Sequence, residues 1–388
     1  MNKSILCISS SDYEGIRWGR TFPLARALAH NGLEVVLLVS EKRKSLKLWH
    51  KRYIDGVTII CYNAIIPYRI RKLPIGLFTL NFMMRALYAL FHKCDLVYSD
   101  CGETPCSGWP CKINQFIYKS KYLSEYGDLL GKGGYYDSKS HLYRILFGRY
   151  FLWAISYFRQ TSDYVLVLSE VMRNYVIEEM KIVPEKIILV PGGSLPDKIS
   201  FKELPNSLNR EVRLGYIGID DEELKGILPI LLCIKKIYPS DFKIFLFGKK
   251  VSDSIIEKYG LRDIIVEHGW VDVIKGQNKI SEVDIFLLMR KDLLIGSMGW
   301  PNKLGDYLSY GRPVMIDPYG DLVSFVESHE EGFIRVNRND EQDICEKLKS
   351  ILDEDYKLST MGKYNRQIAE NEISWDARVK VLINNISY

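Results

Sequence analysis

The sequence predicts an α/β protein made of two Rossmann-like units, and two observations carry this prediction. Short apolar runs alternate with amphipathic stretches along the chain, which is typical of parallel strands covered by helices. The pattern starts again after a stretch near the middle that is rich in Pro, Gly, Ser and Asn, at 191–209. With 388 residues, 47% of them hydrophobic and 26% charged, the chain has the size and composition of two globular domains. We therefore predict domains at 1–195 and 210–373, joined by a linker at 196–209.

Each predicted unit opens with a strand, a loop and a helix. In the first unit these are a strand at 4–9, a polar loop at 10–18 and a helix at 20–30, which Asn31 and Gly32 end. Further strands are predicted at 34–39, 57–61, 95–99, 114–118, 164–168 and 186–190, and a long aromatic-rich helix at 138–158. In the second unit strands are predicted at 213–217, 242–247, 264–268 and 283–288. A loop at 218–223 and Lys225-Gly226 precede the first helix of this unit.

The segment from Glu41 to Lys93 is strongly basic, with eleven Lys or Arg against two acids, and apolar clusters lie between the cations. Such a composition suits the surface of an anionic membrane. A solvated rim around ordinary core helices is the alternative. Nucleic acid is not predicted as a partner, because the net charge is only +5 and no DNA- or RNA-binding signature accompanies it.

The cysteines and the hydrophobic segments indicate a cytoplasmic protein. No opening stretch resembles a signal peptide, and the apolar segment 73–92 contains Pro74, Asn81 and Arg85, so we do not predict that it spans a membrane. The eight cysteines are expected to be free thiols in a reducing cytoplasm. The spacing of Cys101, Cys106 and Cys111 does not match that of zinc ligands, and no metal is predicted.

Two carboxylates in the first unit are candidates for a sugar site. Glu125 and Asp128 lie among tyrosines and glycines in a predicted loop at 122–136. Long loops that follow strands are often functional. The alternative is a mobile surface loop with two solvated acids.

A short helix in the second unit carries the clearest functional signal. Pro301 suits its first position and Gly311 its end, while the presumed N-cap, Trp300, has no side-chain oxygen. The first-turn N–H groups are therefore left for an anion, and the helix dipole favours one. Lys303 adds a positive charge in that turn.

Asp306, one turn further, shares a helix face with Asn302 and Lys303, and its carboxylate can accept two hydroxyl hydrogen bonds from a sugar. The helix would thus hold a nucleotide, with phosphate at its tip and ribose along its side. An ordinary amphipathic helix with a Lys303–Asp306 surface pair is the alternative.

Read from Pro301 to Val314, the pattern Pro-x-Lys-x-x-acid-Tyr-Leu-x-x-Gly-x-Pro-Val resembles the donor-binding motif of glycosyltransferase family 4, the retaining GT-B enzymes. The resemblance implies a GT-B fold, in which two Rossmann-like domains face a cleft. The second domain would bind a nucleotide-sugar donor and the first a glycan or lipid-linked glycan acceptor, without a required metal. The segment 374–388 resembles the helix that packs near the domain junction of that family.

The resemblance assigns roles to further residues of the donor domain. Gly218 and Lys225 match the family's glycine and diphosphate-binding lysine, and Trp270 lies in the segment 268–271 expected beside the nucleobase. Ile219 stands where the family has an arginine, and Met298 where it has the first acid of a pair. In the first domain, Gly15 and Gly19 are the matching candidates for the glycines near the donor phosphates, although a tight turn explains them equally well.

These assignments predict a retaining glycosyltransferase of cell-surface polysaccharide synthesis. Lys225 and Lys303 would neutralise the charge on the leaving diphosphate, and Glu125 and Asp128 are weaker catalytic candidates. We expect the enzyme in the cytoplasm, with peripheral contact to the inner face of the membrane. A catalytically inactive nucleotide-sugar-binding partner is the alternative, which Ile219 and Met298 suggest. An NAD-dependent Rossmann enzyme is disfavoured, because no Gly-x-Gly-x-x-Gly follows Ile8.

Overall fold

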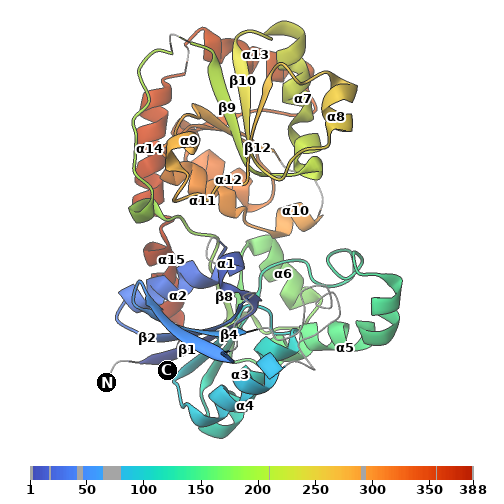
Figure 1. Cartoon of the computed structure of the whole chain (residues 1–388), viewed down its shortest axis with the longest axis vertical. Coiled ribbons are helices and arrows are strands. Elements are labelled where there is room, and N and C mark those ends of the chain that lie inside the picture. The colour runs from blue at the N-terminus through green and yellow to red at the C-terminus, as the bar shows by residue number, and fades with distance from the viewer. Residues whose placement is uncertain are drawn as a thin grey trace. The chain divides into compact units, whose positions relative to one another are not determined.

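The computed structural model describes residues 3–16, 19–41, 47–63, 80–208, 210–289, 294–354 and 356–386 (Figure 1). The chain divides into two compact units, each built around a sheet. Unit 1 comprises Met1–Gly192, Met298–Trp300 and Trp375–Tyr388, and unit 2 comprises Gly193–Ser297 and Pro301–Ser374. The prediction of two Rossmann-like α/β units is confirmed. None of the helices among the described residues is long and apolar enough to cross a bilayer.

Unit 1 contains a sheet with the strand order β3-β4-β2-β1-β5-β6-β7-β8. The strands are β1 Ser4–Asp12, β2 Glu34–Glu41, β3 Trp49–Ile54, β4 Val57–Asn63, β5 Leu96–Ser99, β6 Lys121–Tyr126, β7 Tyr164–Val167 and β8 Ile187–Leu189. All neighbours pair in parallel except β3 and β4, which form a hairpin that the sequence analysis did not predict. Asp55 and Gly56 make its turn, both with positive φ, as a two-residue hairpin turn requires.

The helices of unit 1 are α1 Tyr13–Ile16, α2 Thr21–His30, α3 Leu80–Phe91, α4 Pro105–Tyr118, α5 His141–Gln160, α6 Glu170–Glu178 and α15 Trp375–Asn385. The strand predicted at 114–118 is wrong, because these residues are the end of α4 and the strand is β6. Pro105 starts α4, and Lys119 ends it in the left-handed conformation. Exposed β-formers such as Phe116 and Ile117 misled the prediction.

A buried arginine stabilises the proline inside α4. Pro110 has no N–H, so the carbonyl of Cys106, four residues earlier, lacks its helical partner. The guanidinium of Arg85 donates to that carbonyl at 3.3 Å and to the carbonyl of Ser9. Arg85 therefore fastens α3 to both β1 and the interrupted turn of α4.

Unit 2 contains a fully parallel sheet with the order β11-β10-β9-β12-β13-β14. Its strands are β9 Val212–Ile219, β10 Phe242–Gly248, β11 Ile265–Gly269, β12 Ile285–Met289, β13 Val314–Asp317 and β14 Phe333–Arg335. Its helices are α7 Asp221–Ile237, α8 Asp253–Tyr259, α9 Gln277–Ile280, α10 Leu294–Met298, α11 Asn302–Ser309, α12 Asp321–Ser328, α13 Glu341–Leu352 and α14 Leu358–Asn371. Apolar side chains of β9, β10, β12, α7 and α13 share one core.

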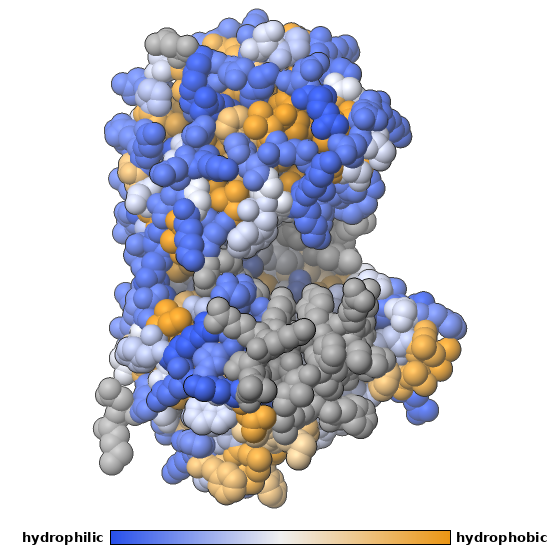
Figure 2. Space-filling model, viewed as in Figure 1, coloured by the Kyte–Doolittle hydropathy of each residue, from blue (hydrophilic) through white to orange (hydrophobic). Residues whose placement is uncertain are grey.

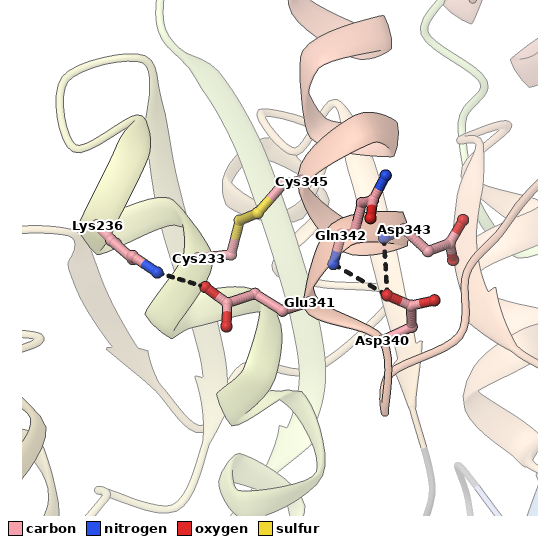
Figure 3. Close-up of a disulfide and its surroundings, with 7 residues drawn as sticks. All are labelled: Cys233, Lys236, Asp340, Glu341, Gln342, Asp343 and Cys345. Atoms are coloured by element: carbon pink, nitrogen blue, oxygen red, sulfur yellow. Dashed lines mark hydrogen bonds and ion pairs between the residues drawn. A yellow bond between two sulfur atoms is a disulfide. The ribbon is translucent and has the colours of Figure 1, made fainter.

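A disulfide joins two helices of unit 2, so the prediction of free thiols is wrong for two of the eight cysteines (Figure 3). Cys233 of α7 is bonded to Cys345 of α13. Beside it Lys236 forms an ion pair with Glu341 at 2.7 Å, and the Asp340 carboxylate caps α13. The bond was not predictable, because 112 residues separate the two cysteines and only the packing of α7 on α13 brings them together.

We predict that this disulfide stabilises unit 2 by about 2–4 kcal/mol, because it closes a long loop in the unfolded chain. Cys345→Ser, or a thiol reductant added to the wild type, should lower the free energy of unfolding, measured by urea denaturation of the full chain, by a similar amount. The reductant should have no further effect on Cys345→Ser. Equal wild-type midpoints with and without reductant would contradict the prediction.

Candidate functional site

The candidate site lies at the carboxyl edge of the unit 2 sheet, where β9 ends. Gly218 has φ +77°, a left-handed conformation that suits glycine, and a Cβ built on it would meet no atom within 4 Å. The backbone is thus open to a ligand at this point. Open α/β sheets bind their ligands at this edge.

Helix α11 presents an uncapped N-terminus. The structure corrects the prediction by one residue, because Pro301, with φ −72° and ψ 112°, is the N-cap and Asn302 is the first helical residue. No side chain among the described residues caps the helix. Trp300, the N-cap predicted from the sequence, is buried, with 7% of its surface exposed. The N–H of Leu304, the third helical residue, donates to the carbonyl of Pro301 at 3.0 Å. Without a side-chain cap, the positive end of the helix dipole at this terminus suits an anion.

Two contacts fix α11 against the end of β9. Tyr307 stacks on Phe286 of β12, with ring centroids 4.1 Å apart, and its hydroxyl accepts from the backbone N–H of Ile217 at 3.1 Å. Gly305 allows close approach on another side, since a Cβ there would lie 2.4 Å from the carbonyl oxygen of Gly193. The helix terminus is therefore held rigidly beside the open backbone at Gly218.

Lys303, in the first turn of α11, is held by a tyrosine and a carboxylate. Its Nζ donates to the hydroxyl of Tyr216 at 2.9 Å and lies 3.4 Å from Glu223 Oε1. The Tyr216 hydroxyl in turn donates to Oε2 of Glu223. Only 18% of the lysine side chain is exposed, so its charge acts in a partly desolvated environment.

Asp306 lies one turn after Lys303 and is partly buried. Among the described residues no donor lies within hydrogen-bond distance of its carboxylate. Burial raises the pKa of Asp306 to about 7, and the charge of Lys303 only partly opposes this. The Lys303–Asp306 surface pair of the alternative interpretation is not formed, and the carboxyl is available to accept hydrogen bonds from hydroxyl groups.

Lys225 and Ile219 lie differently from what the resemblance implied. Lys225 is in the second turn of α7, which begins at Asp221 rather than after 226, and it pairs with Glu222 at 2.6 Å on the surface. Ile219 belongs to the buried core. The position of the expected arginine therefore supplies no cation.

The N-terminus of α7 is already capped by its own acids. The Asp220 carboxylate accepts from the N–H groups of Glu222 and Glu223, each at 3.1 Å, and Asp221 accepts from the N–H of Ser252 at 2.9 Å. Of α7 and α11, only α11 therefore begins without a side-chain cap.

Two further predicted donor-site residues, Asn302 and Trp270, lie on unit 2. Asn302 is exposed at the start of α11, and Trp270, with 71% of its surface exposed, directly follows β11. The imidazole of His268 stacks on Phe247, with ring centroids 4.8 Å apart, and burial lowers its pKa. Met298 is fully buried, and its carbonyl accepts from the hydroxyl of Ser169 at 2.6 Å, so this position serves packing within unit 1.

In unit 1 the weaker candidates do not gather into one site. Glu125 is part of strand β6, not of a loop, and its buried carboxylate pairs with Arg20 at 2.7 Å and accepts from Tyr98. Asp128 is exposed beyond the strand, and Gly15 lies in α1. The buried carboxylate of Glu125 thus holds Arg20, whose guanidinium also donates to the carbonyls of Val190 and Pro191.

Asp100, which the sequence analysis missed, lies at the carboxyl edge of the unit 1 sheet. It follows β5 and accepts from the N–H of Ser10 at 3.2 Å and from the hydroxyls of Thr21, at 3.1 Å, and Ser9. Burial raises its pKa to about 6 against these hydrogen bonds. Its signal was available, because an acid directly after a buried strand run is aimed at the binding edge of a parallel sheet.

Two further parts of the sequence analysis concern the three cysteines and the basic segment. Cys101 lies in the turn before α4, Cys106 and Cys111 lie within α4, and among the described residues no three His, Cys, Asp or Glu side chains gather as metal ligands would. Of the basic segment at 41–93, residues 42–46 and 64–79 lie outside the described residues. In the described part, Glu41 pairs with Arg52 and His50 on the β3 edge.

No protein-family model and no curated protein matches the sequence. Solved structures do match, over nearly the whole length of both chains. A sucrose-phosphate synthase from Thermosynechococcus elongatus covers 99% of this chain and 98% of its own, with a TM-score of 0.71 and 16% identity. HepE from Anabaena, in complex with UDP and glucose, covers 99% of both chains with a TM-score of 0.68 and 13% identity.

A third match is WaaG, a glycosyltransferase involved in lipopolysaccharide biosynthesis. It covers 99% of this chain and 100% of its own, with a TM-score of 0.64 and 12% identity. These similarities confirm the predicted GT-B fold, and at such identities they establish the fold alone.

We predict that Asp306→Asn stabilises the ligand-free protein at alkaline pH. A carboxyl whose folded pKa is about 7 keeps its proton in the folded state while the unfolded chain loses it near pH 4, so stability falls as the pH rises between these values. The neutral asparagine avoids this loss. Between pH 4 and pH 7 the free energy of unfolding of the variant should rise by about 1–3 kcal/mol relative to that of wild type. Above pH 7 the difference should stay constant.

Thermal unfolding at pH 4.5 and pH 8 measures this difference. Asp241→Asn, at an exposed carboxylate of the same unit, is the control and should show no pH-dependent gain. An Asp306→Asn effect that is the same at both pH values would contradict the raised pKa.

Proposed function

We propose that the protein is a glycosyltransferase that moves a sugar from a nucleotide-sugar donor to a glycan or lipid-linked glycan, with retention of anomeric configuration. The observation that carries the proposal is the uncapped N-terminus of α11 with Lys303 in its first turn, fixed beside the open backbone of Gly218. On a GT-B fold, this is a site for the diphosphate of a nucleotide sugar.

The matching structures support this choice of ligand. HepE was solved with UDP and glucose, and WaaG is a glycosyltransferase involved in lipopolysaccharide biosynthesis. We extend the nucleotide-sugar donor to this chain and propose a role in cell-surface polysaccharide synthesis. The donor base, the sugar and the acceptor are left open.

In the proposed complex, the diphosphate lies against Lys303, the first-turn N–H groups of α11 and the backbone at Gly218. Asp306 accepts the ribose hydroxyls, and Asn302 lies beside the phosphates. The segment 268–271, with exposed Trp270, is next to the nucleobase. Lys225 approaches the diphosphate only when it leaves its surface pair with Glu222.

The main requirement of the proposed reaction is to stabilise the negative charge that develops on the leaving diphosphate. The bond between the anomeric carbon and the diphosphate oxygen breaks, and the diphosphate leaves with the electron pair. The acceptor hydroxyl forms the new bond on the same face, and its proton passes to the departing phosphate oxygen, so no side-chain base is required. Lys303 and the α11 terminus stabilise the charge that develops.

A catalytically inactive nucleotide-sugar-binding partner is the second candidate, and two observations favour it. Ile219 and Met298 occupy the positions of a basic and an acidic residue in the resembling family, and both side chains are buried in apolar surroundings. In addition, Glu223 places a negative charge beside Lys303.

The two candidates are separated by incubating the full chain with a panel of nucleotide sugars and measuring release of the nucleoside diphosphate. Hydrolysis or transfer with one donor supports the enzyme. Binding of a donor without turnover, with and without glycan or lipid-linked acceptors, favours the inactive partner. Failure to bind any nucleotide sugar would overturn both.

We predict that Lys303→Ala weakens UDP binding by about 1.5–3 kcal/mol, because it removes a partly desolvated charged contact. Lys225→Ala should cost less, since Lys225 is exposed and already paired. Calorimetric titration with UDP and GDP measures both effects. Lys236→Ala, at the far end of α7, is the control and should bind as wild type does. Unchanged UDP affinity in Lys303→Ala would contradict the proposed diphosphate site at α11.

We also predict that Asp306 distinguishes ribose from dideoxyribose. Wild type should bind UDP more tightly than its 2′,3′-dideoxy analogue, and Asp306→Asn should lose most of this preference, because the carboxylate is the stronger acceptor for two hydroxyl groups. The dideoxy nucleotide should bind wild type and variant alike. A variant that keeps the full preference for ribose would place the ribose elsewhere.

The proposed cellular setting is the cytoplasm, with peripheral contact to the inner face of the membrane where a lipid-linked acceptor is exposed. The disulfide in unit 2 removes the argument from free thiols for two cysteines, so this proposal rests on the donor and acceptor chemistry.

A further inference from the structure

Helix α5 of unit 1 carries a row of apolar side chains that the fold does not bury. Leu142, Ile145 and Leu146 are 64%, 64% and 61% exposed, and Trp153 is 45% exposed. With exposed Arg149 they follow the spacing i, i+3, i+4, i+7 and i+11, so they share one side of the helix. We call these five residues the α5 face. Figure 2 shows hydrophobic residues gathered where Figure 1 draws the first turns of α5.

The opposite side of the helix already forms the core of unit 1. Phe151, Ala154, Ile155 and Phe158 are buried there. The α5 face is therefore not a core surface, and an apolar face of this kind marks an interaction site.

The surroundings of the α5 face are cationic. The helix contains no Asp or Glu, and in the segment 131–153 four cations stand against one acid, Asp137. That carboxylate accepts from the N–H of Gly133 at 2.7 Å and so lies within its own loop. Lys139 lies 3.8 Å from the ring centroid of the exposed Tyr135, directly before the helix.

The direction of α5 places the most exposed residues of the α5 face near the carboxyl edge of the unit 1 sheet. Strand β6 precedes the helix, and β7, which follows it, pairs with β6 in parallel. The helix must therefore return the chain from the carboxyl edge to the amino edge, and its first turns, with Leu142 to Leu146, lie near the carboxyl edge. That is the edge at which an open α/β sheet binds its ligands.

A second group of exposed apolar side chains lies at the other edge of the unit 1 sheet. Phe116 and Ile117 end α4, just before β6 begins, and they are 77% and 44% exposed. They lie at the amino edge of the sheet, away from the ligand edge, and they provide a natural control.

We infer that the α5 face docks on the surface of an anionic lipid bilayer and brings the carboxyl edge of unit 1 to a membrane-bound acceptor. Leucine, isoleucine and tryptophan side chains enter the interface, while Arg149, Lys132 and Lys139 meet the lipid phosphates. The membrane-bound acceptor in this inference rests on the proposed function. The α5 face itself is defined by the exposure of the α5 side chains alone.

A second copy of this chain fits the face less well. In a two-fold contact the same surface meets itself, so the cations around one α5 face would oppose those around the other. Within the segment 131–153, Asp137 alone is available to offset them. A bilayer with negative head groups has the complementary charge.

Vesicle sedimentation of the full chain tests the inference. Wild type should bind phosphatidylcholine vesicles that contain phosphatidylglycerol at least tenfold more tightly than pure phosphatidylcholine vesicles, and the binding should fade with salt. Leu142→Asp with Leu146→Asp should reduce it at least tenfold. Phe116→Asp with Ile117→Asp, which adds the same charge at the amino edge, should stay within twofold of wild type. Equal binding to both vesicle types, or a larger loss in the α4 variant than in the α5 variant, would overturn the inference.

Two further measurements separate lipid docking from misfolding and from self-association. Unchanged thermal unfolding and UDP affinity show that the α5 variant is folded. Sedimentation velocity without lipid should give a monomer, whereas a dimer that Leu142→Asp with Leu146→Asp dissociates would make the occupant a second copy and overturn the inference. The proposed function is contradicted by a different result. If the chain binds anionic vesicles but no nucleotide sugar, the membrane-docking inference stands and the glycosyltransferase proposal is wrong.

Discussion

The candidate site depends on the contact between Tyr307 and the end of β9. The ring stacks on Phe286, and the buried hydroxyl accepts the N–H of Ile217, one residue before the open glycine. This bond satisfies a backbone donor where β9 leaves the sheet, and it fixes α11 at the same time. A helix terminus serves as an anion site only when it is held in a defined place, and the tyrosine supplies that constraint for the proposed site on α11.

Much of this arrangement could be predicted from the sequence, because it is local. The motif from Pro301 to Gly311 specifies a short helix that begins with an uncapped turn and ends at a glycine, whose φ is +61°. The error of one residue at its start has a physical cause. Proline fixes φ at a value that both an N-cap and a first helical residue adopt, and only ψ, which the sequence does not reveal, distinguishes them.

The features that the sequence did not reveal depend on contacts between distant segments. The raised pKa of Asp306 is set by the packing around α11, and the Cys233–Cys345 bond by the packing of α7 on α13. The hairpin of β3 was hidden because Lys51 and Arg52 interrupt its apolar pattern, although Asp55-Gly56 was a usable turn signal. At Ile219, burial of the side chain follows from the register of β9, which a motif comparison alone does not give.

The charges around the candidate site favour α11 over α7 as the anion-binding helix. Both begin at the carboxyl edge of the same sheet, but α7 starts with four consecutive acids, and Asp220 accepts the N–H groups that an anion would need. The cation of Lys225 is offset by Glu222, and no cation stands at Ile219. A diphosphate at this edge therefore depends on Lys303 and the α11 dipole, with Glu223 opposing it. Glu223 acts against such a site in two ways, because its carboxylate would repel an anion and also pairs with the lysine that the anion needs.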